Sequence, residues 1–170
     1  MISANRIDRG TITRMTDAPI RIRPAVPTDL DVIVAFNQAQ AMESEHKHLD
    51  PAVLTPGVRR AIEDQNRCLY FVAEVGGQLA GQTMVTREWS DWRNGFFWWI
   101  QSVYVDPAYR RRGVFRALHQ HVRDLARRDA DVCGIRLYVR RDNERAIQTY
   151  GKLDMAPTEY LVCEEDWSNT

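Results

Sequence analysis

Three consecutive arginines run into a glycine at residues 110–113, directly before a segment with helical spacing. A short strand precedes them and ends at Asp106-Pro107, where proline interrupts the hydrogen-bond ladder. The first amides of a helix have no partner within it, and with the helix dipole they attract anions. Gly113 lacks the Cβ that would keep a phosphate from the backbone, and the arginines add positive charge. The segment predicts a phosphate-binding turn. A solvated basic helix end, with the glycine serving packing, is the alternative that this segment leaves open.

The whole chain carries 23 Lys and Arg against 23 Asp and Glu, so its formal net charge is zero. This balance gives no overall attraction for nucleic acid or membranes. RNA binding through the arginines would also need a broader basic surface with exposed stacking aromatics. No apolar run approaches the roughly 18 residues of a membrane span, and the N-terminus has no signal-peptide core. We therefore expect a cytoplasmic protein without nucleic-acid or membrane partners.

Length and composition indicate one domain, which we place at residues 20–170 after a poorly ordered extension at residues 1–19. Apolar periodicity predicts a mixed α/β (α+β) fold, with a sheet flanked by helices. Helices are expected from Thr28 or Asp29, at 55–65, and from near Arg112 and Asn143. Strands are expected at 20–24, 68–75, 78–89, 96–105, 132–139 and 155–165.

The cysteines and histidines do not indicate a metal site. Cys68, Cys133 and Cys163 have no motif spacing and are expected to be buried free thiols in a reducing compartment. His46 and His48 share one loop, but two histidines without a third ligand make a weak case for a metal. We expect no bound metal.

With its neighbouring elements the arginine turn resembles the GNAT superfamily of N-acetyltransferases, over about residues 20–164. VYVDPAYRRRGVFRAL (103–118) is similar to the family's strand, Arg-x-x-Gly-x-Gly/Ala turn and helix, with Phe115 where a small residue is usual. NERAIQTYGKLDM (143–155) is similar to a second family motif, with Asp154-Met155 in place of Gly-Phe. The resemblance implies a mostly antiparallel mixed sheet in which two parallel strands, 96–105 and 132–139, splay apart.

The resemblance also implies acetyl-CoA as a cosubstrate. Its pyrophosphate would lie on the amides of residues 111–116, and its pantetheine arm would pair with the strand edge at 103–105. Asn143 would bind the pantetheine or cap its helix, and Tyr150 would protonate the leaving thiolate; a core aromatic is the alternative for Tyr150. The expected cofactor-binding residues are Val103, Tyr104, Val105, Arg110, Arg111, Arg112, Gly113, Val114, Phe115, Arg116, Asn143 and Tyr150.

The general base is less evident. Many relatives carry Glu on the strand before the turn, where this chain has Gln101, whose amide cannot take up a proton. Glu45 and Glu88 rank together as candidates and Glu43 comes next. For each of them a solvated surface carboxylate is the alternative.

An acceptor pocket is expected beside this strand. Trp89 and Trp92 sit in a turn-rich loop, where packing explains tryptophan poorly, so we expect them to wall the pocket. A homodimer contact is the alternative for this pair. The expected acceptor-binding residues are Glu43, Trp89, Trp92, Trp99 and Gln101. The expected function is acetyl transfer to a primary amine of a small acceptor by direct attack in a ternary complex; the alternative is a non-catalytic acyl-CoA-binding module.

Overall fold

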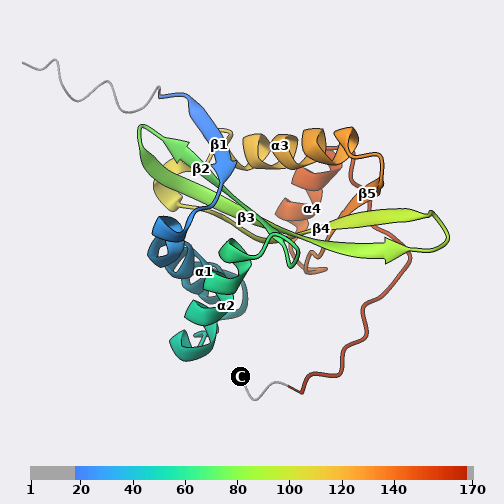
Figure 1. The fold of residues 1–170 in the computed structure, drawn as a ribbon, viewed down its shortest axis with the longest axis horizontal. Coiled ribbons are helices and arrows are strands. Elements are labelled where there is room, and N and C mark those ends of the chain that lie inside the picture. Colours follow the sequence, from blue (N-terminus) through green and yellow to red (C-terminus); the bar gives the residue numbers. More distant parts are fainter. Residues whose placement is uncertain (1–17, 168–170) are drawn as a thin grey trace, which may run out of the picture.

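One five-stranded sheet organises the chain, and its strands stand in sequence order (Figure 1). The computed structural model describes residues 18–167. Neighbouring strands pair antiparallel except for the last pair, which is parallel. This arrangement confirms the predicted mixed, mostly antiparallel sheet. The strands are β1 (Ile20–Pro24), β2 (Leu69–Val75), β3 (Gln78–Ser90), β4 (Gly95–Val105) and β5 (Val132–Leu137).

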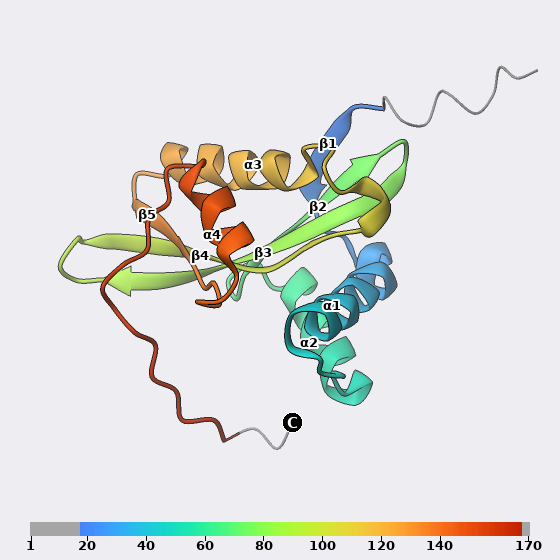
Figure 2. The ribbon, with the colours of Figure 1, turned by 180° about the vertical axis from the view of Figure 1, so that it is seen from behind.

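Helices cover both faces of the sheet (Figures 1 and 2). α1 (Leu30–Glu45) and α2 (Pro51–Glu63) lie on one face, and α3 (Val114–Arg128) lies on the other with the short α4 (Glu144–Gly151) beside it. α2 begins four residues before the predicted start at residue 55. The reason is local: the Asp50 side chain accepts the N–H of Ala52 at 2.8 Å, and Pro51 occupies the first helical position.

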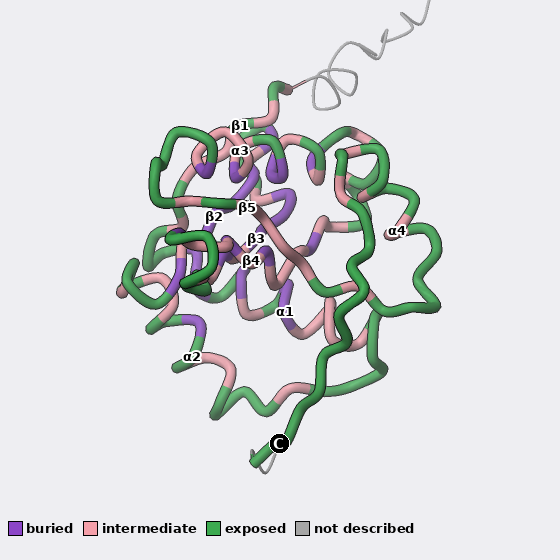
Figure 3. Tube along the Cα trace, turned by 90° about the vertical axis from the view of Figure 1, so that its right-hand side faces the viewer, coloured by how far each residue is buried: buried purple, intermediate pink, exposed green. Residues whose placement is uncertain are grey.

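Each face has its own apolar core (Figure 3). Under α3, Leu118 and Val122 pack on Trp98 and Ile100 of β4. Under α1 and α2, a second cluster packs on β2; its buried members are Leu30, Ile33, Val58, Cys68, Tyr70 and Val72. β4 lies between β3 and β5, which fits its apolar residues on both faces.

The predicted last strand, residues 155–165, is wrong. No residue of 155–167 lies in a strand, and residues 156–167, which we name the C-terminal arm, are all exposed. The consecutive apolar residues 160–163 give this segment strand propensity, but a strand also needs a path that brings it to an edge, and the arm runs away from the sheet (Figure 1). The prediction of three buried thiols is likewise wrong for Cys163, which lies in the arm, and for Cys133, on the outermost strand; Cys68 is buried. The predicted N-terminal extension falls almost entirely outside the described residues.

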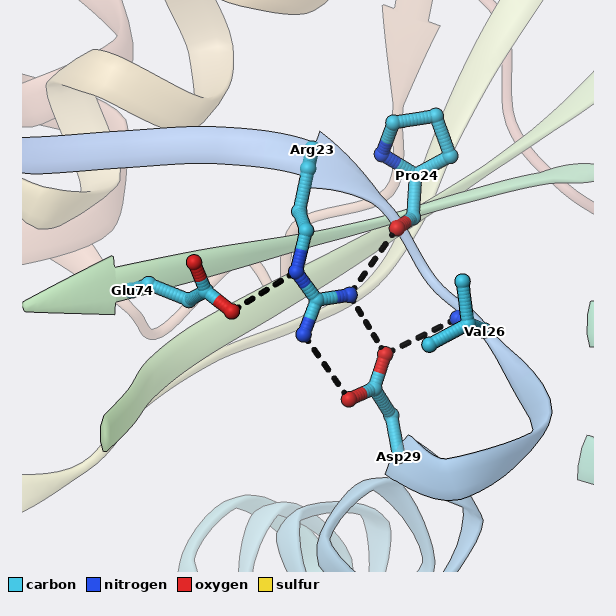
Figure 4. Close-up of polar contacts among 5 residues, drawn as sticks. All are labelled: Arg23, Pro24, Val26, Asp29 and Glu74. Carbon is cyan, nitrogen blue, oxygen red and sulfur yellow. Dashed lines mark hydrogen bonds and ion pairs between the residues drawn. The ribbon is translucent and has the colours of Figure 1, made fainter. Parts of the chain in front are cut away.

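A charged cluster ties the start of α1 to the sheet (Figure 4). Arg23 of β1 donates two hydrogen bonds to the Asp29 carboxylate, at 2.7 and 2.9 Å, and its Nε donates to Glu74 of β2 at 2.7 Å. Asp29, which is 6% exposed, also accepts the N–H of Val26 at 2.8 Å. Burial alone would raise the pKa of Asp29, but these hydrogen bonds outweigh it and hold the pKa below its ordinary value.

Replacement of Arg23 by Met would leave the buried Asp29 carboxylate without its cation. We expect the free energy of unfolding at neutral pH to fall by about 3 kcal/mol. Arg21→Met, on an exposed position of the same strand, is the matched control and should change it by less than about 0.5 kcal/mol. Urea denaturation of the two variants measures the difference.

The same pair of variants has a defined pH dependence. Because the folded-state pKa of Asp29 lies below its unfolded value, the cluster stabilises the fold above the unfolded pKa of about 3.9. That contribution is lost as the pH falls through the folded-state pKa. The gap between wild type and Arg23→Met should therefore narrow in acid. A gap that stays constant down to acid pH would contradict the assignment.

Candidate functional site

β4 and β5 part about halfway along β4. Their parallel pairing runs from Phe96 opposite Val132 to Ile100 opposite Leu137, where β5 ends. β4 continues to Val105 beside β3 alone. Ser102 has a φ of +49°, and the register with β3 shifts at this point, so a β-bulge marks the parting. The predicted splay is therefore present, and residues 101–105 leave one edge without a strand partner among the described residues.

Buried polar side chains lie behind the bulge. Gln82 of β3, fully buried, donates to Asn37 of α1 at 2.9 Å, and Asn37 donates to the Tyr70 hydroxyl at 3.2 Å. Burial is the main cause that raises the pKa of Tyr70 to about 12, and Ser102 lies near the same hydroxyl. These contacts fix the backbone at the bulge. Sequence reasoning missed them, although an amide inside an apolar strand or on an apolar helix stripe is a usable signal.

The arginine turn has the backbone that an anion site needs. Gly113 has a φ of +84° and immediately precedes α3, and Arg111 has a φ of +61°. The first hydrogen bond of the helix runs from the Ala117 N–H to the Gly113 carbonyl at 2.9 Å. The amides of residues 114–116 therefore make no hydrogen bond to a described residue.

Space at the turn matches this backbone. A Cβ built at Gly113 meets no protein atom within 4 Å, so the glycine does not serve packing. What it supplies is a left-handed conformation and an open approach to three unpaired amides. These residues fit the diphosphate of a coenzyme.

The arginines themselves spread in different directions. Arg110 donates to both oxygens of Glu43, at 2.9 and 2.6 Å, and to the Val105 carbonyl at 2.9 Å. Arg112 lies over the ring of Tyr109, at 5.2 Å from its centroid. Arg110 thus faces α1 and already bonds one carbonyl of the predicted pantetheine edge. The exposed arginines of the turn are Arg110, Arg111 and Arg116.

α4 brings Tyr150 to the start of α3. Its ring meets Phe115 edge-on with centroids 5.8 Å apart, and burial raises the Tyr150 pKa. The hydroxyl bonds no described residue. Phe115, at the position where the family motif has a small residue, packs along the helix between Tyr150 and His119. Asn143 caps α4 by accepting the Ala146 N–H at 3.0 Å, which is one of its two expected roles.

Each candidate base already has a cationic partner. Glu43, besides Arg110, accepts the hydroxyl of Tyr104 at 3.1 Å; burial first, and then this contact, raises the Tyr104 pKa. Glu45 lies 3.3 Å from the ammonium of Lys47. Glu88 of β3 pairs with Arg136 at 3.1 Å and accepts the indole N–H of Trp99. The structure does not gather the three: Glu43 and Glu45 end α1, and Glu88 stands opposite Phe97 on the sheet.

The expected acceptor residues divide into two groups. Trp99 lies at the parting, stacked on Tyr138 with centroids 4.4 Å apart, and Gln101 donates to Thr86 at 2.7 Å. Trp89 and Trp92 lie instead at the tip of the β3–β4 hairpin, 52% and 85% exposed (Figure 1). The sequence could not distinguish the two groups, because the place of the hairpin tip follows from the register and not from the residue types.

Residues 18–167 contain neither a membrane-spanning helix nor a cluster of metal ligands. No helix there is long and apolar enough to cross a membrane. No group of three or more potential ligands is arranged to hold a metal ion in this part of the chain.

Known proteins are similar to this chain in sequence or in fold. A possible acetyltransferase from Clostridium difficile 630 is 43% identical, with a TM-score of 0.82 over 88% of this chain and 99% of that one. A predicted acetyltransferase with acetyl-CoA from Clostridium acetobutylicum is 17% identical, with a TM-score of 0.68 over 86% and 96% of the two chains, and so shares the fold. Thialysine N-epsilon-acetyltransferase of Caenorhabditis elegans is 25% identical over 73% of this chain and 75% of its own length.

The family assignment follows from a match over most of the chain. The model of the acetyltransferase (GNAT) family matches residues 35–155, a span that contains the parting of β4 and β5, the arginine turn and α4. The parting of β4 and β5 and the glycine before α3 agree with this match. The chain therefore belongs to the GNAT family of acetyltransferases.

Proposed function

We propose that the protein transfers an acetyl group from acetyl-CoA to a primary amine of a small acceptor. One observation carries the proposal: the amides of residues 114–116 bond no described residue, Gly113 directly before them leaves open space, and residues 101–105 of β4 have one edge without a described strand partner. The C. elegans relative, whose name specifies an amine acceptor, supports the nitrogen nucleophile. The proposed cosubstrate supplies an activated acetyl thioester.

Residues of three elements would hold the cosubstrate. The amides of residues 114–116 bind the diphosphate, aided by the charge of Arg111 and Arg116. The edge of β4 at Val103 pairs with the amide groups of the pantetheine arm, as a strand would. Asn143 keeps its Nδ2 for the same arm, because its Oδ1 is occupied as the helix cap.

Tyr150 is the proposed acid. The amine nitrogen bonds to the acetyl carbon as the carbon–sulfur bond breaks, the amine gives up a proton, and the thiolate takes one from Tyr150. A thiol of this kind has a pKa of about 8.5, below that of a phenol, so proton transfer from Tyr150 to a free thiolate is uphill. The phenol acts by donating its proton as negative charge develops on the sulfur, and the tyrosinate takes a proton back from solvent. Because burial raises the Tyr150 pKa above its ordinary value, the phenol stays protonated across the neutral range. It is therefore ready to donate.

The proton of the amine goes to Glu88 or Glu45 in this proposal, with Glu43 next. Glu88 lies on the sheet close to Trp99, beside the parting of the strands. Glu45 lies at the end of α1, across from the loop that follows β5. A non-catalytic acyl-CoA-binding module remains the second candidate, favoured by Gln101 at the family's usual glutamate position.

Substitution of Gly113 tests the proposed diphosphate site. Gly113→Ala adds a methyl group to space that no protein atom fills, so we expect acetyl-CoA affinity to fall at least about tenfold, together with a loss of about 1 kcal/mol in stability. Gly77→Ala is the matched control, since Gly77 has a φ of +80° and equally open surroundings in the β2–β3 turn. It should lose similar stability and keep full affinity. Calorimetric titration tests both; equal affinities would refute the diphosphate site.

A second prediction separates catalysis from binding. Tyr150→Phe should lower kcat by about 100-fold, the scale of acid catalysis, while acetyl-CoA affinity and Tm stay close to wild type. Tyr109→Phe, at another half-buried tyrosine, is the control and should leave kcat unchanged. If Tyr150→Phe keeps its full kcat, the phenol is a packing residue. If no amine yields free CoA even with the wild-type protein, the binding-module candidate is favoured.

A third prediction identifies the base. Gln is introduced singly at Glu43, Glu45 and Glu88, and kcat/KM is measured across pH with one amine acceptor. Loss of the acting carboxylate should lower kcat/KM about 100-fold or more and remove the acidic limb of the pH profile. We expect this from Glu88→Gln or Glu45→Gln. Near wild-type rates in all three variants would instead assign the proton to water.

A further inference from the structure

The outer edge of β5 is open. Among the described residues β5 pairs only with β4, and it forms the last strand of the sheet. Such an edge presents unpaired N–H and C=O groups, which proteins normally cover or protect with prolines and charges. β5 has no proline, and its single charged residue, Arg136, lies over Phe97, 3.6 Å from the ring centroid, on one face of the sheet. The edge is thus available for another strand.

The C-terminal arm, in contrast, is a segment with strand propensity that pairs with no strand among the described residues. It carries large apolar side chains that the described part of the chain leaves mostly uncovered: Tyr160, Leu161, Val162 and Trp167 are 77%, 69%, 65% and 83% exposed. Its central residues, EYLVC (159–163), have strand propensity. Folded proteins rarely leave such a run uncovered.

The arm does not turn back to its own sheet. Met155 still lies beside the first half of β5, and Asp154 just before it has a φ of +63°. The arm leaves the fold past β5 and runs clear of the sheet (Figures 1 and 2). Because the arm leaves from beside the open edge of β5, it can pair with the same edge of β5 in a second copy of the chain.

A cavity next to the outer edge of β5 has apolar and basic walls that suit the apolar and acidic side chains of the arm. A cavity of about 310 Å³ lies between α3 and β5, with Ile135, Leu153 and Met155 among its apolar walls and Arg127 among its charged ones. His119, 3% exposed, also lines it, and its Nδ1 has no hydrogen-bond partner in the described part of the chain. The arm provides apolar side chains, a tyrosine hydroxyl, and four acidic residues without a lysine or arginine: Glu159, Glu164, Glu165 and Asp166.

We propose that two molecules exchange their C-terminal arms, each arm adding a strand to the outer edge of β5 in the other molecule. Backbone hydrogen bonds along β5 hold the exchanged strand, and one of its apolar side chains enters the cavity beside Ile135. Residues around Pro157 form the hinge. The partner's strand then lies next to Tyr138, which follows β5 and stacks on Trp99, so the dimer borders the parting of β4 and β5. This inference does not depend on the proposed acetyl transfer.

Proline substitution in the arm tests the exchange without disturbing the body of the protein. The arm makes no backbone hydrogen bond to another described residue, so a proline costs a monomer little. Adjacent residues of a strand direct their N–H groups to opposite sides, and therefore Leu161 or Val162 must direct its N–H toward β5. At least one of Leu161→Pro and Val162→Pro should weaken the dimer at least about tenfold. Val162→Thr keeps the N–H and the branched shape and is the matched control.

Analytical ultracentrifugation of the full chain gives the dissociation constants, and hydrogen exchange reports on the arm. We expect a wild-type dimer in which the amides of residues 158–166 are protected, and loss of that protection in the proline variant that dissociates. A wild-type monomer at micromolar concentration would overturn the proposal. So would a dimer that neither proline variant weakens, or one whose arm amides exchange freely.

Discussion

The parting of β4 from β5 is the constraint on which the rest of the structure depends. A sheet that paired fully would leave no backbone edge inside the molecule. Here the left-handed Ser102 interrupts the regular strand, at a cost of about 1–3 kcal/mol for backbone of this kind. The buried amides of Asn37 and Gln82 with the Tyr70 hydroxyl hold that backbone in place. Their position between α1 and the sheet explains why polar groups occur in an otherwise apolar layer: they fix a bend that apolar packing alone would not specify.

The two faces of the sheet contribute different parts of the site. The face under α3 supplies a rigid helix start, because Val114, Leu118 and Val122 are buried in the core directly after Gly113. The opposite face supplies side chains from α1, β3 and the end of β4, and its aromatic and charged groups are partly exposed. In the proposed function, the diphosphate is bound by backbone held on a packed core, whereas loops and side chains bind the acceptor.

The sequence predicted the parts of the site that depend on local backbone chemistry. The strand, arginine turn and helix around Gly113 were predictable, since glycine, proline and helical spacing act over a few residues. So was the cap at Asn143. Contacts between distant segments were not predictable. Nothing in the sequence indicates that Arg110 meets Glu43 or that Glu88 meets Arg136, and the hairpin register alone separates Trp89 from Trp99. The final strand was wrongly predicted for the same reason: the path of the chain after Met155, and not local propensity, decides whether residues 155–165 reach an edge of the sheet.

Electrostatic pairing links the two sides of the site through one residue. The chain is neutral overall, and each candidate base is held by a nearby cation. For Glu43 that cation is Arg110, which belongs to the turn and also bonds the Val105 carbonyl. Any movement of Arg110 toward an anion at the start of α3 breaks its bonds to both. The same movement exposes a carbonyl of the β4 edge and leaves a carboxylate without its counter-charge. In the proposed function, anion binding at the turn is therefore coupled through this guanidinium to the ion pair of Glu43 at the end of α1.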